Sequence, residues 1–165
     1  MDVQDVTLII NTVSMLLVGI SAFLLRKQIQ AEHEWNRRKV AEETLTRFTS
    51  GDFTDSLDEL DDQFQWNILL SGGDLYENII ERLSEKEKKD IDRVLVNIFR
   101  NLETVCIKMR HGVLDEDISY DYLFSVLTII DKKCKVFVEN VREARNEPRV
   151  YENTEHYALK WASKK

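Results

Sequence analysis

Residues 84–112, SEKEKKDIDRVLVNIFRNLETVCIKMRHG, carry a regular helical pattern of apolar residues. Apolar side chains recur every three or four positions, so they share one face of a helix. Ser84 and Glu87 have the spacing of a capping box at the start of this helix, and His111-Gly112 is a typical end. The stretch therefore predicts a long amphipathic helix. Its apolar face contains Ile91, Leu95, Ile98, Leu102, Val105 and Met109.

A second long helix is expected to begin behind Asp115 and to end before Pro148. Only the short link Val113-Leu114-Asp115 separates it from the first. Two long helices joined by so short a link fold back on each other, so the sequence predicts an antiparallel hairpin at the centre of the domain. The apolar positions of the second helix include Val126, Ile129, Ile130, Phe137 and Val141.

Three shorter helical segments accompany this hairpin, at residues 55–70, 75–83 and 153–165. The last one places Tyr157 and Trp161 on one face. With 5 glycines, 1 proline and 32% charged residues among 165, the composition favours helices over sheets. We therefore expect an all-α fold, with one N-terminal transmembrane helix and a cytoplasmic helical bundle built on the long hairpin.

The charge distribution argues against general nucleic-acid binding, because the formal net charge is -7. Nine carboxylates and no Lys or Arg occur between Gly51 and Glu81. This stretch is interpreted as a solvated face, with a contact surface for a basic partner as the alternative. Cys106 and Cys134 lack the spacing of a metal or redox site and fall on apolar helix faces, so we expect both to pack in the core.

The N-terminal run from Val6 to Leu25, VTLIINTVSMLLVGISAFLL, contains no charged residue. Its 20 residues would make a helix of about 30 Å, the thickness of a bilayer's hydrocarbon core. Acidic residues precede the run and basic residues follow it, which is not the pattern of a cleaved signal peptide. The run predicts a membrane-spanning helix.

Basic residues follow the run closely, and such residues are retained on the cytoplasmic side of a membrane. They are Arg26, Lys27, Arg37, Arg38 and Lys39. We therefore expect an inner-membrane protein with its N-terminus outside and its C-terminal domain in the cytoplasm. The expected parts are an external N-terminus at 1–5, a transmembrane helix at 6–25, a juxtamembrane helix at 26–50 and a cytoplasmic helical domain at 51–165.

Four of the five polar residues of the run, all except Thr12, lie with Val18 on one stripe of the predicted helix, spaced four, three, four and three positions apart. This stripe consists of Thr7, Asn11, Ser14, Val18 and Ser21. Because lipid offers such groups no hydrogen-bond partner, the stripe predicts self-association of the helix into a homo-oligomer. Two alternatives remain open: a plain anchor whose hydroxyls bond their own backbone, and a narrow pore.

No catalytic site, metal site or cofactor is predicted. His33, His111 and His156 lack metal-ligand spacing, and phosphate-binding or nucleophile motifs are absent. One pair, Arg149 and His156, has the spacing of HEPN-type ribonucleases, in which His acts as acid or base and Arg stabilises phosphorane charge. A chance spacing in an arginine-rich chain is the alternative interpretation.

A set of cationic and aromatic residues near the C-terminus suggests a site for a small anionic, base-containing ligand. The set contains Arg142, Arg145, Arg149, Tyr151, Tyr157 and Trp161. In the alternative interpretation, Arg142 and Arg145 pair with glutamates of their own helix, and the aromatic residues cap the core. Those glutamates are Glu139, Glu143 and Glu147.

Several features together resemble a family of small single-pass membrane proteins of unknown function from bacteria, archaea and their viruses. They include the N-terminal apolar run, Trp35 with Arg37, the stretch NLETVCIKMRHGVLDED at 101–117, and the terminal Tyr157 and Trp161. In that stretch the matching positions are Glu103, Gly112 and Asp115, and the pair Arg142 and Arg145 matches as well. The resemblance implies an N-terminal anchor and a helical cytoplasmic domain, but no catalytic residue. Its members occur near mobile elements and defence genes, which associates the family with antiviral defence.

The leading functional hypothesis is a membrane-anchored helical sensor or interaction module that self-associates through its transmembrane helix. The expected partners are the lipid bilayer, further copies of the chain, and a protein partner or a small anionic ligand. An alternative is an antiphage effector whose cytoplasmic domain binds a ligand, such as a nucleotide signal, and perturbs the membrane. A third is an anchored HEPN-like ribonuclease.

Overall fold

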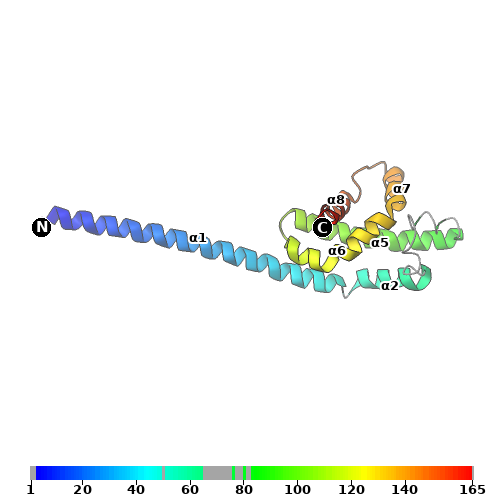
Figure 1. Ribbon diagram of the computed structural model, residues 1–165, viewed down its shortest axis with the longest axis horizontal. Helices are drawn as coiled ribbons and strands as arrows, with labels where there is room; N and C mark the ends of the chain where they lie inside the picture. The colour runs from blue at the N-terminus through cyan, green and yellow to red at the C-terminus, as the bar shows by residue number, and fades with distance from the viewer. Residues whose placement is uncertain (1–2, 50, 65–75, 77–79, 81–82, 165) are drawn as a thin grey trace. The chain divides into compact units, whose positions relative to one another are not determined.

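A computed structural model of the chain describes residues 3–49, 51–64, 76, 80 and 83–164, excluding the side chains of residues 3–13, 47, 49, 52, 63 and 64. The chain divides into two compact units, Met1–Lys39 and Val40–Lys165. All regular structure in the described residues is helical, which confirms the all-α prediction (Figure 1). The helices are α1 (Val3–Thr49), α2 (Asp52–Phe64), α5 (Glu85–Arg110), α6 (Glu116–Lys133), α7 (Lys135–Arg145) and α8 (Glu152–Ala162).

The first unit consists of the greater part of α1, with its described side chains exposed to solvent. Phe23 and Trp35 each lie under a lysine of the next turn, Lys27 and Lys39, with nitrogen-to-ring distances of 5.2 and 5.3 Å. Residues 6–13 of the predicted transmembrane run have no described side chains. Within the part of the chain with described side chains, no helix is long and apolar enough to cross a membrane.

Helix α5 is the central element of the second unit, and its predicted start is confirmed. The Ser84 hydroxyl accepts a hydrogen bond from the Glu87 N–H at 3.4 Å, and the Glu87 carboxylate accepts one from the Ser84 N–H at 2.8 Å. At the other end Gly112 has φ +67°, a left-handed conformation that costs glycine little. All six predicted apolar positions of this helix are buried, together with Val94, Phe99 and Cys106.

The prediction of one long helix behind Asp115 is wrong. The segment is broken at Cys134, which has φ -121° and ψ 27°, and it forms α6 and α7 on either side. Cys134 is fully buried, and the Phe137 ring packs 5.5 Å from Phe99. The sequence around the break contains no glycine or proline, so tertiary packing overrides the helix-favouring local sequence. Helix α7 then ends at Asn146, which has φ 49°, before Pro148 is reached.

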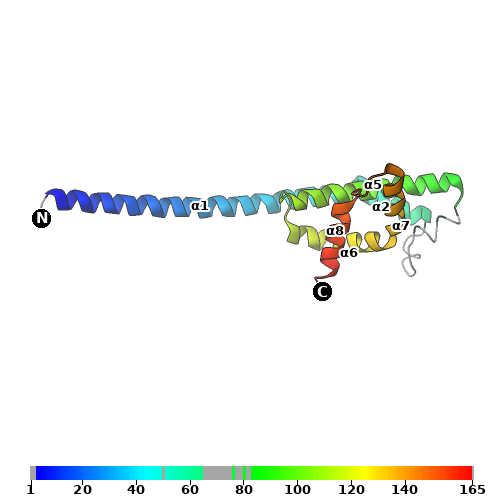
Figure 2. The same cartoon turned by 90° about the horizontal axis from the view of Figure 1, so that it is seen from above.

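The predicted hairpin has the expected antiparallel direction, but its two arms do not pack directly against each other as expected. Helix α6 runs back antiparallel to α5, as Figures 1 and 2 both show. However, α8 packs closely against both helices, which contact each other much less. The C-terminal helix thus fills the space between the two arms of the hairpin, while α2 packs against α5. Helix α8, which corresponds to the predicted C-terminal helical segment, is therefore central to the core.

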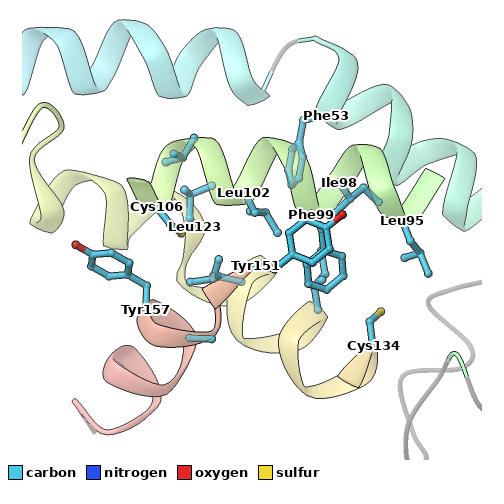
Figure 3. Close-up of a cluster of buried hydrophobic side chains, with 14 of the residues drawn as sticks. Phe53, Leu95, Ile98, Phe99, Leu102, Cys106, Leu123, Cys134, Tyr151 and Tyr157 are labelled. Carbon is cyan, nitrogen blue, oxygen red and sulfur yellow. The ribbon is translucent and has the colours of Figure 1, made fainter. Parts of the chain in front are cut away.

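The core gathers aromatic and aliphatic side chains around Phe99 (Figure 3). Its ring lies 5.0 Å from Tyr151 and 5.5 Å from Phe137. Cys106 and Cys134 are buried free thiols, as predicted. The helix predicted at 55–70 begins earlier, at Asp52, and the part of it beyond Phe64 lies outside the described residues. Most of the predicted helix 75–83 also lies outside them.

Candidate functional site

A pocket of about 910 Å³ opens in the second unit between α6, α7 and α8. Phe99 and Tyr151, whose rings lie 5.0 Å apart, line it together with charged groups from three helices. Asp131 comes from α6, Arg142 from α7 and Glu155 from α8. An apolar pocket with a few converging polar groups is the usual form of a small-molecule site.

Two of the charged groups are paired with each other. The Arg142 guanidinium donates to the Glu155 carboxylate at 2.8 Å, and its Nε donates to the Val150 carbonyl at 3.0 Å. This contact joins the end of α7 to α8 across the intervening turn. Arg142 thus pairs with Glu155 in this structure, and not with the glutamates of its own helix.

Asp131 has no such partner. None of the described residues donates a hydrogen bond to its carboxylate or forms a salt bridge with it. Burial and the nearby Glu155 raise the pKa of Asp131 to about 6, while Arg142 and Lys135 lower it. At neutral pH the pocket therefore contains an ionised carboxylate held without direct neutralisation.

Replacement of Asp131 by asparagine is expected to stabilise the protein at neutral pH. Because the folded pKa of about 6 exceeds the model-compound value of 3.8, the folded state binds this proton more tightly. The stabilising effect of that proton is complete below pH 4 and is lost as pH rises through about 6. We expect Asp131→Asn to raise the free energy of unfolding at pH 7 by about 1–2 kcal/mol, after allowance for solvent screening.

Urea unfolding followed by circular dichroism at pH 7 and at pH 4 measures this effect. The gain should be several times smaller at pH 4, where Asp131 is protonated in the folded state and much of the unfolded state is protonated as well. Asp121→Asn, on the exposed face of the same helix, is the matched control and should change stability little. A gain of the same size at both pH values would contradict the assignment to Asp131 ionisation.

A second polar cluster joins α5 to the beginning of α8. One Glu103 oxygen accepts hydrogen bonds from the Asn153 backbone N–H at 3.3 Å and its side-chain amide at 2.7 Å. The other oxygen accepts from the Thr154 N–H and hydroxyl, both at 2.8 Å. Tyr151, the residue at the N-cap of α8, makes no capping bond of its own. Glu103 therefore caps α8 from a neighbouring helix.

The sequence matches a protein family described as "Domain of unknown function (DUF4760)" over residues 8–161. The chain belongs to the DUF4760 family. No curated protein and no solved structure matches it. The expected membership of an uncharacterised family is thereby confirmed, while the single-pass topology and the distribution among organisms remain predictions. The DUF4760 match includes the whole pocket except Ala162, and it includes Glu103 with its partners.

The ligand residues predicted from this DUF4760 sequence do not share one site. Arg142 and Tyr151 line the pocket, whereas Tyr157 and Trp161 are buried in the core. Arg145 is exposed at the end of α7 and is not part of the pocket lining. Burial of the two aromatic residues agrees with the alternative interpretation in which they cap the core.

The predicted catalytic pair lies on and just before α8. Arg149 is exposed and donates two hydrogen bonds to Glu152, at 2.9 and 3.0 Å. His156 is exposed, and its ring meets the Tyr157 ring edge-on at 5.2 Å. No contact joins Arg149 to His156 among the described residues. The ribonuclease hypothesis stays a prediction.

The predicted association stripe is described only in part. Thr7 and Asn11 lie outside the described side chains, while Ser14, Val18 and Ser21 are exposed on α1. Sequence reasoning did not find the pocket carboxylates Asp131 and Glu155, which lie on different helices. The available signal was local: Asp131 directly follows Ile129 and Ile130, two apolar positions of the second predicted helix.

Proposed function

We propose that this DUF4760 protein is a membrane-anchored sensor module. Its N-terminal helix anchors it in the inner membrane with the N-terminus outside, and copies of this helix associate through their polar stripe. The helical domain lies in the cytoplasm and binds a small ligand in the pocket between α6, α7 and α8.

The exposed apolar surface of α1 is the observation that carries this proposal. Met15 is 80% exposed, and the apolar residues that follow it are each more than half exposed. They are Leu16, Leu17, Val18, Ile20, Phe23, Leu24 and Leu25. An apolar patch of this extent marks an interaction site for a membrane or another protein. Of these two, a membrane is favoured, because the run 6–25 is uncharged and basic residues follow it, as in a spanning helix.

Membrane fractionation of cells expressing the full chain tests the anchor. We expect the protein in the membrane fraction, resistant to extraction at alkaline pH, because a spanning helix is removed only by detergent. The double change Leu16→Arg with Ile20→Arg should release it, since each arginine at the centre of a spanning helix costs about 2.5–3.5 kcal/mol. A control change, Glu43→Arg in the domain, should leave it bound. Recovery of the unaltered chain in the soluble fraction would refute the anchor.

Self-association is expected to follow the polar stripe. Single cysteines replacing Ser14, Val18 or Ser21 should form disulfide-linked dimers under oxidation in native membranes, because these positions would face the neighbouring copy. Cysteines replacing Leu16, Ile20 or Leu24 on the opposite face are the matched controls and should crosslink at least about fivefold less. The native Cys106 and Cys134 stay in place because both are buried. Equal crosslinking on both faces would contradict association through the stripe.

The pocket supports the sensing part of the proposal. Its volume of about 910 Å³ falls within the range of small-molecule sites, and its charged groups come from three separate helices. A ligand bound there would contact α6, α7 and α8 at once. Such a ligand stabilises the arrangement in which these helices are packed together.

A further inference from the structure

We propose that the pocket between α6, α7 and α8 binds a small organic cation, a protonated amine with an apolar ring-sized body. The ammonium group pairs with Asp131, and the body lies against the aromatic and aliphatic lining. This inference rests on the proposed role of the pocket as a ligand site, and it does not depend on the membrane anchor.

The pairing of charges in the pocket leaves one carboxylate for a cation. Arg142 and Glu155 neutralise each other at 2.8 Å, and Lys135 and Glu139 approach within 4.0 Å. Asp131 remains as the carboxylate without a direct partner among the described residues. Lys132 and Lys133 also belong to the lining. Lys132 is exposed and Lys133 is partly exposed, and the charges that act most strongly on Asp131 come from Glu155, Arg142 and Lys135. The carboxylate of Asp131 is thus the charge in the lining that a cationic ligand would neutralise directly.

The raised pKa of Asp131 supports the proposal of a cationic ligand. Burial and Glu155 raise the pKa of Asp131 to about 6, even though Arg142 and Lys135 act in the opposite direction. A cation placed beside this carboxylate would relieve the cost of keeping it ionised. Binding should therefore weaken as pH falls through about 6, since the protonated carboxyl no longer attracts the ammonium group.

The apolar lining suits the body of such a ligand. Phe99 and Tyr151 contribute rings, and Val138, Ala158 and Leu159 contribute aliphatic surface. Aromatic faces attract cations as well as apolar groups, so the two kinds of lining act together. An anion that took Arg142 from Glu155 would leave two carboxylates without a partner in one partly buried site.

Three probes of one shape and different charge test the proposal: benzylamine, benzyl alcohol and benzoate. The full chain, labelled with ¹³C at alanine methyl groups and reconstituted in lipid nanodiscs, is titrated with each. Ala158 and Ala162 line the pocket, whereas Ala41 lies in the core outside its lining and reports any general effect. We expect benzylamine to shift Ala158 and Ala162 at pH 7 with a Kd on the order of 1–10 mM, as befits so small a ligand.

Benzyl alcohol and benzoate should bind at least about tenfold more weakly. Asp131→Asn should weaken benzylamine binding by about the same factor, and misfolding would not explain this because the change is expected to stabilise the protein. Asp121→Asn, on the same helix but outside the pocket lining, is the matched control and should bind benzylamine like the unaltered chain.

The outcomes separate the two proposals. Tighter binding of benzoate, or equal binding of benzylamine to Asp131→Asn, would overturn the assignment of an organic cation. If no probe shifts Ala158 or Ala162, the pocket is not a ligand site and the sensing role fails with it. Membrane fractionation tests the anchor independently of all these results.

Discussion

Replacement of Trp161 by alanine is expected to lower the free energy of unfolding by about 3–5 kcal/mol, the range for removal of a large buried aromatic side chain. Trp161 is 0% exposed and packs against the rings of Tyr120 and Tyr157, at 5.3 and 5.6 Å. Its indole N–H donates to the Glu116 carboxylate at 3.3 Å. The change therefore creates a cavity where α8 meets α6 and also removes a hydrogen bond.

Urea unfolding of the full chain, followed by circular dichroism, measures this loss. Leu159→Ala is the control on the same helix, because Leu159 is 63% exposed and its removal should cost less than about 0.5 kcal/mol. Trp161→Phe should fall between the two, since it retains part of the ring packing but not the N–H. A loss below about 1 kcal/mol for Trp161→Ala would show that α8 is not packed in the core as described.

Replacement of Glu103 by alanine is expected to cost about 2–4 kcal/mol, because four donors of Asn153 and Thr154 lose their acceptor. Two of these donors are backbone N–H groups in the first turn of α8, where no intrahelical partner exists. The carboxylate also places negative charge at the positive end of the helix. Loss of the cap should therefore loosen α8 from α5.

Glu103→Gln tests whether the two carboxylate oxygens, and not only the shape of the side chain, are needed. Glutamine keeps the shape but has one acceptor oxygen, and its NH₂ group would face donors, so it should be destabilising too. Thr104→Ala is the neighbouring control, since the exposed Thr104 hydroxyl bonds to the Arg100 carbonyl of its own helix. Near-native stability of both Glu103 variants in urea unfolding would contradict its role as the cap of α8.

Local signals account for the parts of the fold that were predicted correctly. The start of α5 depends on Ser84 and Glu87, which are three residues apart and bond each other. Its buried face follows from apolar spacing alone, and the left-handed Gly112 marks its end. Each of these features is decided within one or two turns of chain, so a single sequence contains the necessary information.

The errors and omissions concern contacts between distant segments. Glu103 was noted in the sequence, but its role depends on residues about 50 positions away. No glycine or proline marks the break at Cys134, where Cys134 and Phe137 are both buried in the core, so the local sequence did not predict it. Asp131 and Glu155 likewise reach one pocket only because α8 packs against α6.

The sequence by itself determined the all-α class, the caps and buried face of α5, and the burial of Cys106 and Cys134, because helix periodicity and capping act over a few residues. Only the tertiary structure decided that α8 fills the hairpin, that Glu103 caps it, and that Asp131, Arg142 and Glu155 line one pocket. Those results depend on which apolar faces pack together, and many pairings of amphipathic helices satisfy the same local pattern.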